Sequence, residues 1–148
     1  MIDFKYNIIC SGIISGMIIF QTSIIAPTVF KTLELSQIRD LLRNVFPKLF
    51  KAIAGVSLIS FLFSLVFGAP YKIQYIVSFI TMVFSLICLS IIPATNKAKD
   101  DGNDKLFSAL HKVSVSITML ILAINLFWIL YIWYIYGDEL RVIRGFRL

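Results

Sequence analysis

Charge is scarce in this 148-residue chain, and so are the residue types that most often carry catalysis. Charged residues make up 15% of the sequence, hydrophobic residues make up 59%, and there is a single histidine. A water-soluble domain of this length needs more charge than this to cover its surface. The composition, with a mean hydropathy of +0.89, therefore predicts a protein whose main solvent is the lipid bilayer.

Cysteine is also rare, and its two positions exclude a disulfide framework. Cys10 and Cys88 both fall in apolar stretches, near opposite membrane faces if the chain crosses four times. Their depths then differ by more than ~10 Å, beyond the roughly 7 Å that a disulfide allows between Cα atoms. We expect two unreactive thiols that carry no information about the redox compartment.

Four long stretches contain no charged residue, at residues 6–30, 52–71, 73–96 and 113–137. Each has about the 20 residues that a helix needs to cross a hydrocarbon core of ~30 Å. We therefore predict an all-α fold, an integral membrane four-helix bundle in one membrane domain spanning residues 1–148. Its expected segments are helices at 6–27, 48–68, 72–93 and 105–136, and a basic tail at 138–148.

A cleaved signal peptide is the alternative interpretation of the first stretch, because "MIDFK" is a weakly basic start. The uncharged run is much longer than the roughly 7 to 15 residues of a signal-peptide core, and "TSIIAPTVF" has no clean small-x-small cleavage site. We expect this helix to remain in the protein.

Four crossings place the chain termini and the "GAPYK" turn on one face, side A, and both longer loops on the other, side B. Side B carries nine Lys and Arg residues and side A carries five. The positive-inside rule then predicts that both loops are cytoplasmic and both termini lie on the opposite side. We expect an integral protein of a bacterial inner (plasma) membrane.

The first side B loop contains "LSQIRDLLRNVFPKLF". Its apolar residues recur with the spacing of one helical face, which predicts a short amphipathic interfacial helix at about 37–46, with Ser36 as its N-cap. Such a helix could be a lid or a binder of anionic lipid headgroups, or a connector that covers the bundle end. Pro27 and Pro93 are predicted to end the first and third helices, and Pro47 to lie in the first turn of the second.

The second side B loop, "NKAKDDGNDK", carries an acidic cluster at Asp100, Asp101 and Asp104. It lacks the ligand spacing and distal glutamate of an EF-hand, so we predict no metal site. A solvated turn in which Asp104 caps the next helix is the expected structure.

Small residues recur at three- and four-residue spacing in the predicted helices, and Gly12 and Gly16 form a GxxxG pair. In lipid, small residues allow close backbone approach, and hydroxyl groups bond across helices. The pattern predicts a tightly packed bundle with little central cavity, although the glycine pair could equally serve a homodimer.

The single histidine lies in "KLFSALHKVSVSIT", at the start of the fourth helix. At ~100° per residue, six polar residues fall within about a third of the circumference of this helix and form a stripe that we expect to face inward: Asp104, Ser108, His111, Ser114, Thr118 and Asn125. In the first helix Gln21 is the expected partner of Thr118 or Ser114. His111 is expected to hydrogen-bond a backbone carbonyl or Asp104, and so to hold the loop onto the bundle.

The four uncharged stretches, which we expect to cross the hydrocarbon core, place no Asp, Glu, Lys or Arg inside the bundle, and this argues against pumps, ion-coupled transport and voltage sensing. Haem ligation by His111 would need a second ligand, such as the histidine of a second copy. Nucleophilic catalysis lacks a carboxylate fixed beside His111 unless Asp104 serves. We predict no cofactor, no catalytic residue and no nucleic-acid partner, because arginines beside a membrane more often meet lipid phosphate.

Four stretches resemble one family of membrane proteins. "IIAPTVFKTL", "NVFPKLF", "IIPATNKAKD" and "ALHKVSVSI" follow one another along the chain. In order and position they resemble the transmembrane protein 205-like family, also called domain of unknown function 4149. The resemblance implies a four-span protein with no established reaction, whose distinctive residues gather at side B: Pro27, Phe30, Phe46, Pro47, Phe50, Pro93, Leu110 and His111.

The leading functional hypothesis is a non-enzymatic accessory, scaffold or assembly protein, whose partners are membrane lipids, including anionic headgroups, and a protein or second copy in the membrane. A passive or facilitated path for a small or lipophilic molecule, gated at side B, is the alternative. A haem- or quinone-linked redox role for His111 is the third hypothesis.

Overall fold

The computed structural model describes the backbone of residues 5–68 and 72–145 and the side chains of residues 6–68 and 72–135. Every regular element in these ranges is a helix. The first span consists of α1 (Lys5–Phe20), the π-helix η1 (Gln21–Ile25) and α2 (Ala26–Thr32). The other three are α3 (Leu35–Phe67), α4 (Ile73–Asp100) and α5 (Asp104–Gly145).

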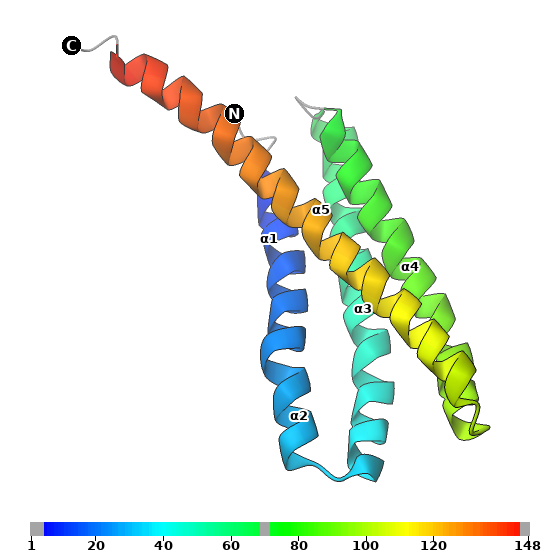
Figure 1. Ribbon diagram of the computed structural model, residues 1–148. Coiled ribbons are helices and arrows are strands. Elements are labelled where there is room, and N and C mark those ends of the chain that lie inside the picture. The colour runs from blue at the N-terminus through cyan, green and yellow to red at the C-terminus, as the bar shows by residue number, and fades with distance from the viewer. Residues whose placement is uncertain (1–4, 69–71, 146–148) are drawn as a thin grey trace.

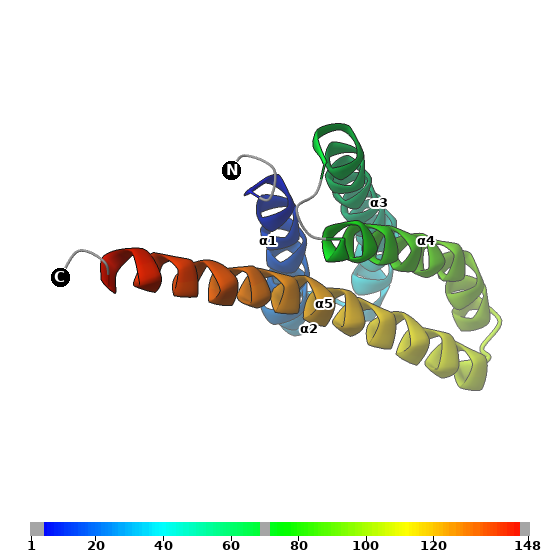
Figure 2. The same cartoon turned by 90° about the horizontal axis from the view of Figure 1, so that it is seen from above.

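All four spans are long and apolar enough to cross a membrane, which confirms the predicted all-α bundle. Neighbours in the chain run antiparallel: α3 packs on α4, α4 packs on α5, and α1 contacts both α3 and α5 (Figure 1). The start of α1 and the end of α5 lie at side A, and the two short turns at 33–34 and 101–103 lie at side B. Figure 2 shows α5 along one side of the molecule, with its C-terminal part reaching beyond α1.

The predicted helix ends are too early at side B. The first span continues through Pro27 to Thr32, and α4 continues past Pro93 to Asp100. Pro27 lies in the first turn of α2, where a missing N–H costs little, and the preceding π-helix changes the local hydrogen-bond register. At side A, α5 also extends beyond the expected end at residue 136, through much of the predicted basic tail.

The separate interfacial helix at 37–46 is not observed, because this segment is the N-terminal part of the continuous, 33-residue α3. Pro47 therefore lies in a helix interior and not in a first turn. Glu34, and not Ser36, is the N-cap: its side chain accepts from the backbone of Gln37, whose Oε1 accepts from the Glu34 N–H at 3.2 Å. This capping box makes the two-residue turn after α2 sufficient to begin a new helix.

At ~1.5 Å per residue α3 is about 50 Å long, which exceeds the ~30 Å hydrocarbon core. Its amphipathic first part therefore prolongs the span at side B. Ile38 is buried there, and Arg43 forms an ion pair with Asp100 at the end of α4. The amphipathic pattern thus marks an extended helix end that packs beside α4.

The turn between α4 and α5 is a Schellman motif around Gly102. The Asn103 N–H donates to the Ala98 carbonyl at 2.9 Å, and the Gly102 N–H donates to the Lys99 carbonyl at 3.3 Å. Gly102 has a φ of +68°, a conformation that residues with a side chain rarely adopt. The turn therefore reverses the chain in three residues.

Two apolar clusters form the hydrophobic part of the core. The larger lies midway along the bundle and towards side B, with six buried residues: Ile14, Ile18, Phe50, Ile53, Cys88 and Ile121. The smaller joins Val77 of α4 to Trp128 and Ile132 of α5, with Ile8 of α1 packed against it. As many polar as apolar residues are buried in the described part of the chain. Hydrogen bonds between buried side chains are therefore a large part of what holds the helices together.

Candidate functional site

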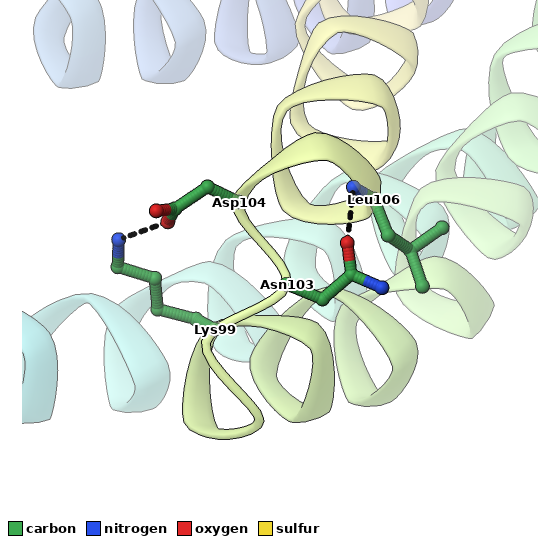
Figure 3. A network of polar contacts seen from close by, with 4 residues as sticks. All are labelled: Lys99, Asn103, Asp104 and Leu106. Carbon is green, nitrogen blue, oxygen red and sulfur yellow. Dashed lines mark hydrogen bonds and ion pairs between the residues drawn. The ribbon is translucent and has the colours of Figure 1, made fainter.

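His111 is exposed on α5, which contradicts its predicted place at the head of an inward-facing stripe. Its ring stacks on Phe107, one turn earlier, with centroids 5.8 Å apart and planes inclined by 7°. The Asp104 carboxylate instead receives a hydrogen bond from Lys99 Nζ at 2.9 Å (Figure 3). The expected hydrogen bond of His111 to Asp104 or a carbonyl is therefore replaced by a ring contact on the helix surface.

Asp104 does not cap α5, because it is the first residue of the helix. The cap is Asn103, whose Oδ1 accepts from the Leu106 N–H at 3.0 Å (Figure 3). Asp104 still suits its position, since a carboxylate in the first turn interacts favourably with the helix dipole. The prediction identified the right turn and placed the cap one residue too late.

The remainder of the expected stripe is buried to different degrees. Ser114 and Thr118 are partly buried, and the Thr118 hydroxyl donates to the Ser114 carbonyl of its own helix at 2.7 Å. Asn125 is 1% exposed, and its Nδ2 donates to Thr81 Oγ1 of α4 at 2.9 Å. Asn125 thus joins α5 to α4 through its side chain.

Gln21 does not bond to α5. It begins the π-helix and is 7% exposed, and its buried Nε2 has no hydrogen-bond partner. Nearby on the inward face of α1, the buried Ser15 Oγ also lacks a partner. The predicted hydrogen bond between Gln21 and Thr118 or Ser114 is therefore wrong.

Gly12 and Gly16 do not pack inside the bundle. Both are exposed, and a Cβ added at either would meet no other atom within 4 Å. Ser11 and Ile14, on the opposite face of α1, are the residues that turn inward. The glycine pair therefore lies on the outer surface of the bundle. The predicted close approach of another helix of the same bundle at these glycines is not observed.

The residues implied by the family resemblance do not form one site at side B. Phe46 and Phe50 stack with centroids 6.5 Å apart and belong to the larger apolar cluster. Pro27 and Pro93 are exposed, and Pro47 is only partly buried. Of the residues that the resemblance singles out, two aromatics therefore belong to the core, and several others lie at the surfaces of their helices.

A hydrogen-bonded group of buried polar side chains lies instead in the side A third of the bundle. We call it the axial polar cluster, and it consists of Asn7, Ser60, Ser64 and Ser78. Asn7 Nδ2 donates to Ser64 Oγ at 3.0 Å, and Asn7 Oδ1 accepts from Ser60 Oγ. Ser60 and Ser78 share a hydrogen bond of 2.9 Å, so the cluster joins α1, α3 and α4.

The inward face of α4 is polar or thiol-bearing over most of the span. This α4 polar seam is at most 5% exposed at each of five positions: Gln74, Ser78, Thr81, Ser85 and Cys88. The Ser85 hydroxyl donates to the Thr81 carbonyl, and Cys88 Sγ lies 3.8 Å from the Ser114 carbonyl of α5. Neither cysteine forms a disulfide, as expected.

Sequence reasoning missed Asn7, Gln74 and Trp128. Asn7 and Gln74 lie at the very start of uncharged stretches, where a polar residue looks like part of the loop. A signal was nevertheless present: Asn7 precedes Ser11 and Ser15 at four-residue spacing, and Gln74 precedes Ser78 in the same way. Extending each seam by one helical turn towards side A would have found both.

Hydrogen bonding is the chemistry that these buried groups can perform. No charged side chain is buried among residues 6–68 and 72–135. Within the same residues no group of three or more His, Cys, Asp and Glu side chains is arranged to hold a metal ion. Along this interior the helices are joined through neutral hydroxyl and amide groups.

These features define the class of protein: an integral membrane four-helix bundle with a neutral, hydrogen-bonded interior. Residues 9–104 match the family described as a domain of unknown function, DUF4149, and because this match covers more than half of the chain, the chain belongs to that family. No curated protein and no solved structure matches it. The matched region includes three of the four stretches that carried the resemblance, whereas the stretch with His111 lies beyond it.

Proposed function

We propose that this protein is a non-enzymatic accessory, scaffold or assembly protein of a bacterial inner membrane, of the transmembrane protein 205-like type. The observation that carries the proposal is that buried polar side chains form hydrogen bonds between helices. Asn7, Ser60 and Asn125 each bond to a side chain of another helix, as expected of groups that hold a bundle together. Such bonds stabilise a membrane bundle and leave these groups unavailable to a substrate.

The position of His111 supports a non-enzymatic role. The ring is on the outer surface of α5, stacked on Phe107, whereas the buried serines lie on other helices. A general base must come within hydrogen-bond reach of the nucleophile it activates. In a haem-linked arrangement His111 would need a ligand from a second copy of the chain.

Membrane lipids are the first partners we propose. Lys48 and Lys51 are exposed on α3 just before its uncharged part begins at residue 52, and Lys97 is exposed near the side B end of α4. Basic side chains at this level attract anionic headgroups by roughly 1 kcal/mol each. With the turns at 33–34 and 101–103 on the cytoplasmic side, these lysines would face the leaflet whose surface is negative.

The scaffold role is tested by in-cell photo-crosslinking from outward positions. A photoreactive residue replaces Ile13 of α1, which is 47% exposed, or Phe127 of α5, which is 77% exposed. The matched control replaces Ile18, which is fully buried on α1. We expect the outward positions to capture one reproducible protein, either a partner or a second copy, and the Ile18 position to capture none.

Two results would contradict the scaffold. One is a crosslinking pattern of lipid adducts alone at both outward positions. The other is a purified protein with a visible absorption band, which would identify a bound chromophore; loss of that band in His111→Ala would assign the band to the histidine.

A passive path for a small neutral molecule is the second candidate, and the α4 polar seam supports it. A path along the expected polar stripe of α5 would begin at His111, which is exposed, and would have to break the bond between Asn125 and Thr81. A path along α4 would have to break bonds such as that between Ser60 and Ser78. Faster glycerol uptake by liposomes that contain the protein, and its loss in Ser78→Leu, would favour this candidate over the scaffold.

A further inference from the structure

Two lysines of α3 lie at a depth where the neighbouring helices α1 and α4 are still uncharged. Lys51 is nine residues from Ser60, which bonds to Ser78 of α4, and nine residues along the antiparallel α4 lead from Ser78 to Ile87. The uncharged stretch of α4 continues from Ile87 to Asn96, or about 13 Å further towards side B. Lys51 is therefore level with an apolar part of α4.

The contacts of α1 give the same depth. Asn7 bonds to the same serine of α3, and nine residues further along α1 is Gly16, in an uncharged stretch that continues to Phe30. Lys48, one turn closer to side B than Lys51, is also level with uncharged residues of both helices. The uncharged part of α3, residues 52–67, is only about 24 Å long, less than the ~30 Å hydrocarbon core.

The two lysines lack a counter-charge. Both are exposed, and neither forms an ion pair within residues 6–68 and 72–135. The Asp100 carboxylate at the end of α4 already pairs with Arg43. At the level of Lys51, α4 presents the apolar side chains of Leu86 and Ile87 at its surface. An unpaired ammonium group beside apolar surface attracts an anion more strongly than one surrounded by water.

The outer face of α3 continues from these lysines as an apolar track. Gly55 is one turn beyond Lys51, and a Cβ added to it would meet no atom within 4 Å. Leu58 and Leu62 follow at three- and four-residue spacing and are 43% and 48% exposed. Five side chains of this part of α3 line an open apolar hollow: Ile59, Leu62, Phe63, Val66 and Phe67. From Lys51 to Leu62 is about 16 Å, close to the ~15 Å of hydrocarbon in one leaflet.

We infer that this outer face of α3 binds one anionic phospholipid of the side B leaflet. Lys48 and Lys51 hold the phosphate, and one acyl chain lies along Gly55 towards Leu62. The inference rests on the lipid contacts proposed above for these lysines and assigns them a lipid class and a course for its chain.

Charge and depth select this ligand. A zwitterionic lipid carries its own cation beside the phosphate, which two unpaired lysines repel, whereas a lipid with net negative charge has none. A dissolved phosphate ion would have to approach side chains that lie level with apolar residues of α1 and α4, without the acyl chains that bring a lipid phosphate to the membrane. The apolar track gives those chains a surface that a free ion cannot use.

The test compares phosphatidylglycerol with phosphatidylcholine of identical acyl chains. The full chain in detergent is titrated with each lipid, and native mass spectrometry gives the dissociation constant of the first bound lipid. We expect phosphatidylglycerol to bind more tightly than phosphatidylcholine. Lys48→Gln/Lys51→Gln should weaken its binding about 30-fold, because each basic residue contributes about fivefold.

A second variant tests the course of the acyl chain. Gly55→Leu keeps both lysines and adds a side chain where the structure has open space, so the fold should be retained. It should weaken phosphatidylglycerol binding by about threefold to tenfold, through loss of apolar contact along the track. Unchanged binding in this variant would overturn the inferred course of the chain.

The matched control is Lys105→Gln/Lys112→Gln, which removes the same charge from two exposed lysines of α5. It should change the affinity for the first phosphatidylglycerol by less than about twofold. Equal weakening by the two lysine pairs would show a response to net charge alone, which would overturn the site on α3 and leave the general lipid contacts intact. Equal affinity for the two lipids would overturn both.

Discussion

Asn7 ties α1 to α3 within the axial polar cluster, because it bonds to both Ser60 and Ser64. Asn7→Ala removes both interhelical bonds and leaves two serine hydroxyls without this partner. At roughly 0.6 to 1 kcal/mol for each bond in a membrane protein, we expect the free energy of unfolding to fall by about 1–2 kcal/mol. Unfolding in mixed micelles with rising SDS measures the change.

The control for this prediction is Asn44→Ala. Asn44 is exposed on α3, and its Nδ2 donates only to the Asp40 carbonyl of the same helix. Its replacement should change the free energy of unfolding by less than about 0.5 kcal/mol. Equal effects at the two asparagines would show that the axial polar cluster does not stabilise the bundle.

His111 and Asn125 show what residue spacing can and cannot predict. An angle of 100° per residue correctly groups them on one stripe of α5, but it does not say which part of the stripe meets another helix. α5 crosses the bundle obliquely, so Asn125 is buried against Thr81 whereas His111, four turns earlier, is exposed (Figure 1). The crossing depends on the packing of all four helices, which no single helix encodes.

At the level of elements, the continuity of α3 can be measured. Spin labels at Gln37 and Leu58, both exposed and 21 residues apart, report the length of the helix across Pro47. We expect a separation of about 32 Å for one continuous helix, and about 22 Å if the segment before Pro47 turned to lie on the membrane. Double electron–electron resonance in nanodiscs distinguishes these values, after both native cysteines have been replaced.

The same spacing within α5 provides the reference. Lys112 and Trp133 are also 21 residues apart and exposed, with no proline between them. Their labels should show the distance of an uninterrupted helix, about 32 Å. A distance for the α3 pair that is clearly shorter than this reference would restore the separate interfacial helix.

The glycines allow a second prediction about elements. Gly12→Ala and Gly16→Ala add a methyl group where nothing lies within 4 Å, in the middle of a helix. Each should raise the free energy of unfolding by about 0.5–1 kcal/mol, because alanine favours the helix more than glycine does. Gly68→Ala should instead lower it, since Gly68 ends α3 with a φ of +75°.

Unfolding curves in detergent measure all three alanine variants, with Gly68 as the internal contrast. A loss of stability in Gly12→Ala or Gly16→Ala would mean that the glycine face is covered by another helix, such as that of a second copy. The monomeric bundle by itself supplies no contact there.

Hydropathy predicted the elements well because lipid imposes a strong, local rule: an uncharged run of sufficient length must form a spanning helix. Hydropathy did not predict the helix ends at side B, because α2 continues past Pro27 to Thr32 and α4 continues past Pro93 to Asp100. There the helices leave the hydrocarbon core and become polar, so hydropathy falls although the helix continues. Capping at Glu34 and Gly102, and not polarity, decides where these helices begin and end.

For the whole molecule, the distribution of charge makes orientation testable. Nine basic residues on side B against five on side A predict that the turns at 33–34 and 101–103 face the cytoplasm. We expect a cysteine placed at exposed Gln37 or Asn103, in a chain without native cysteines, to resist a membrane-impermeant maleimide in intact spheroplasts and to react after lysis. A cysteine at exposed Trp133, near side A, is the control and should react before lysis.

Rapid labelling at Gln37 and Asn103 in intact spheroplasts, with protection at Trp133, would reverse the orientation. The proposed lipid contacts of Lys48, Lys51 and Lys97 would then meet the outer leaflet. The packing of the bundle would be unaffected, because its interior hydrogen bonds are the same in either orientation across the membrane.

Those interior hydrogen bonds have a consequence for how the protein is made. Asn7 bonds to α3, Ser60 of α3 bonds to Ser78 of α4, and Thr81 of α4 bonds to Asn125 of α5. As they leave the ribosome, α3, α4 and α5 thus each find a polar partner on a helix already in the membrane. Assembly of the bundle can therefore follow the order of translation, with the Asn7 amide of α1 paired as soon as the next helix, α3, is inserted.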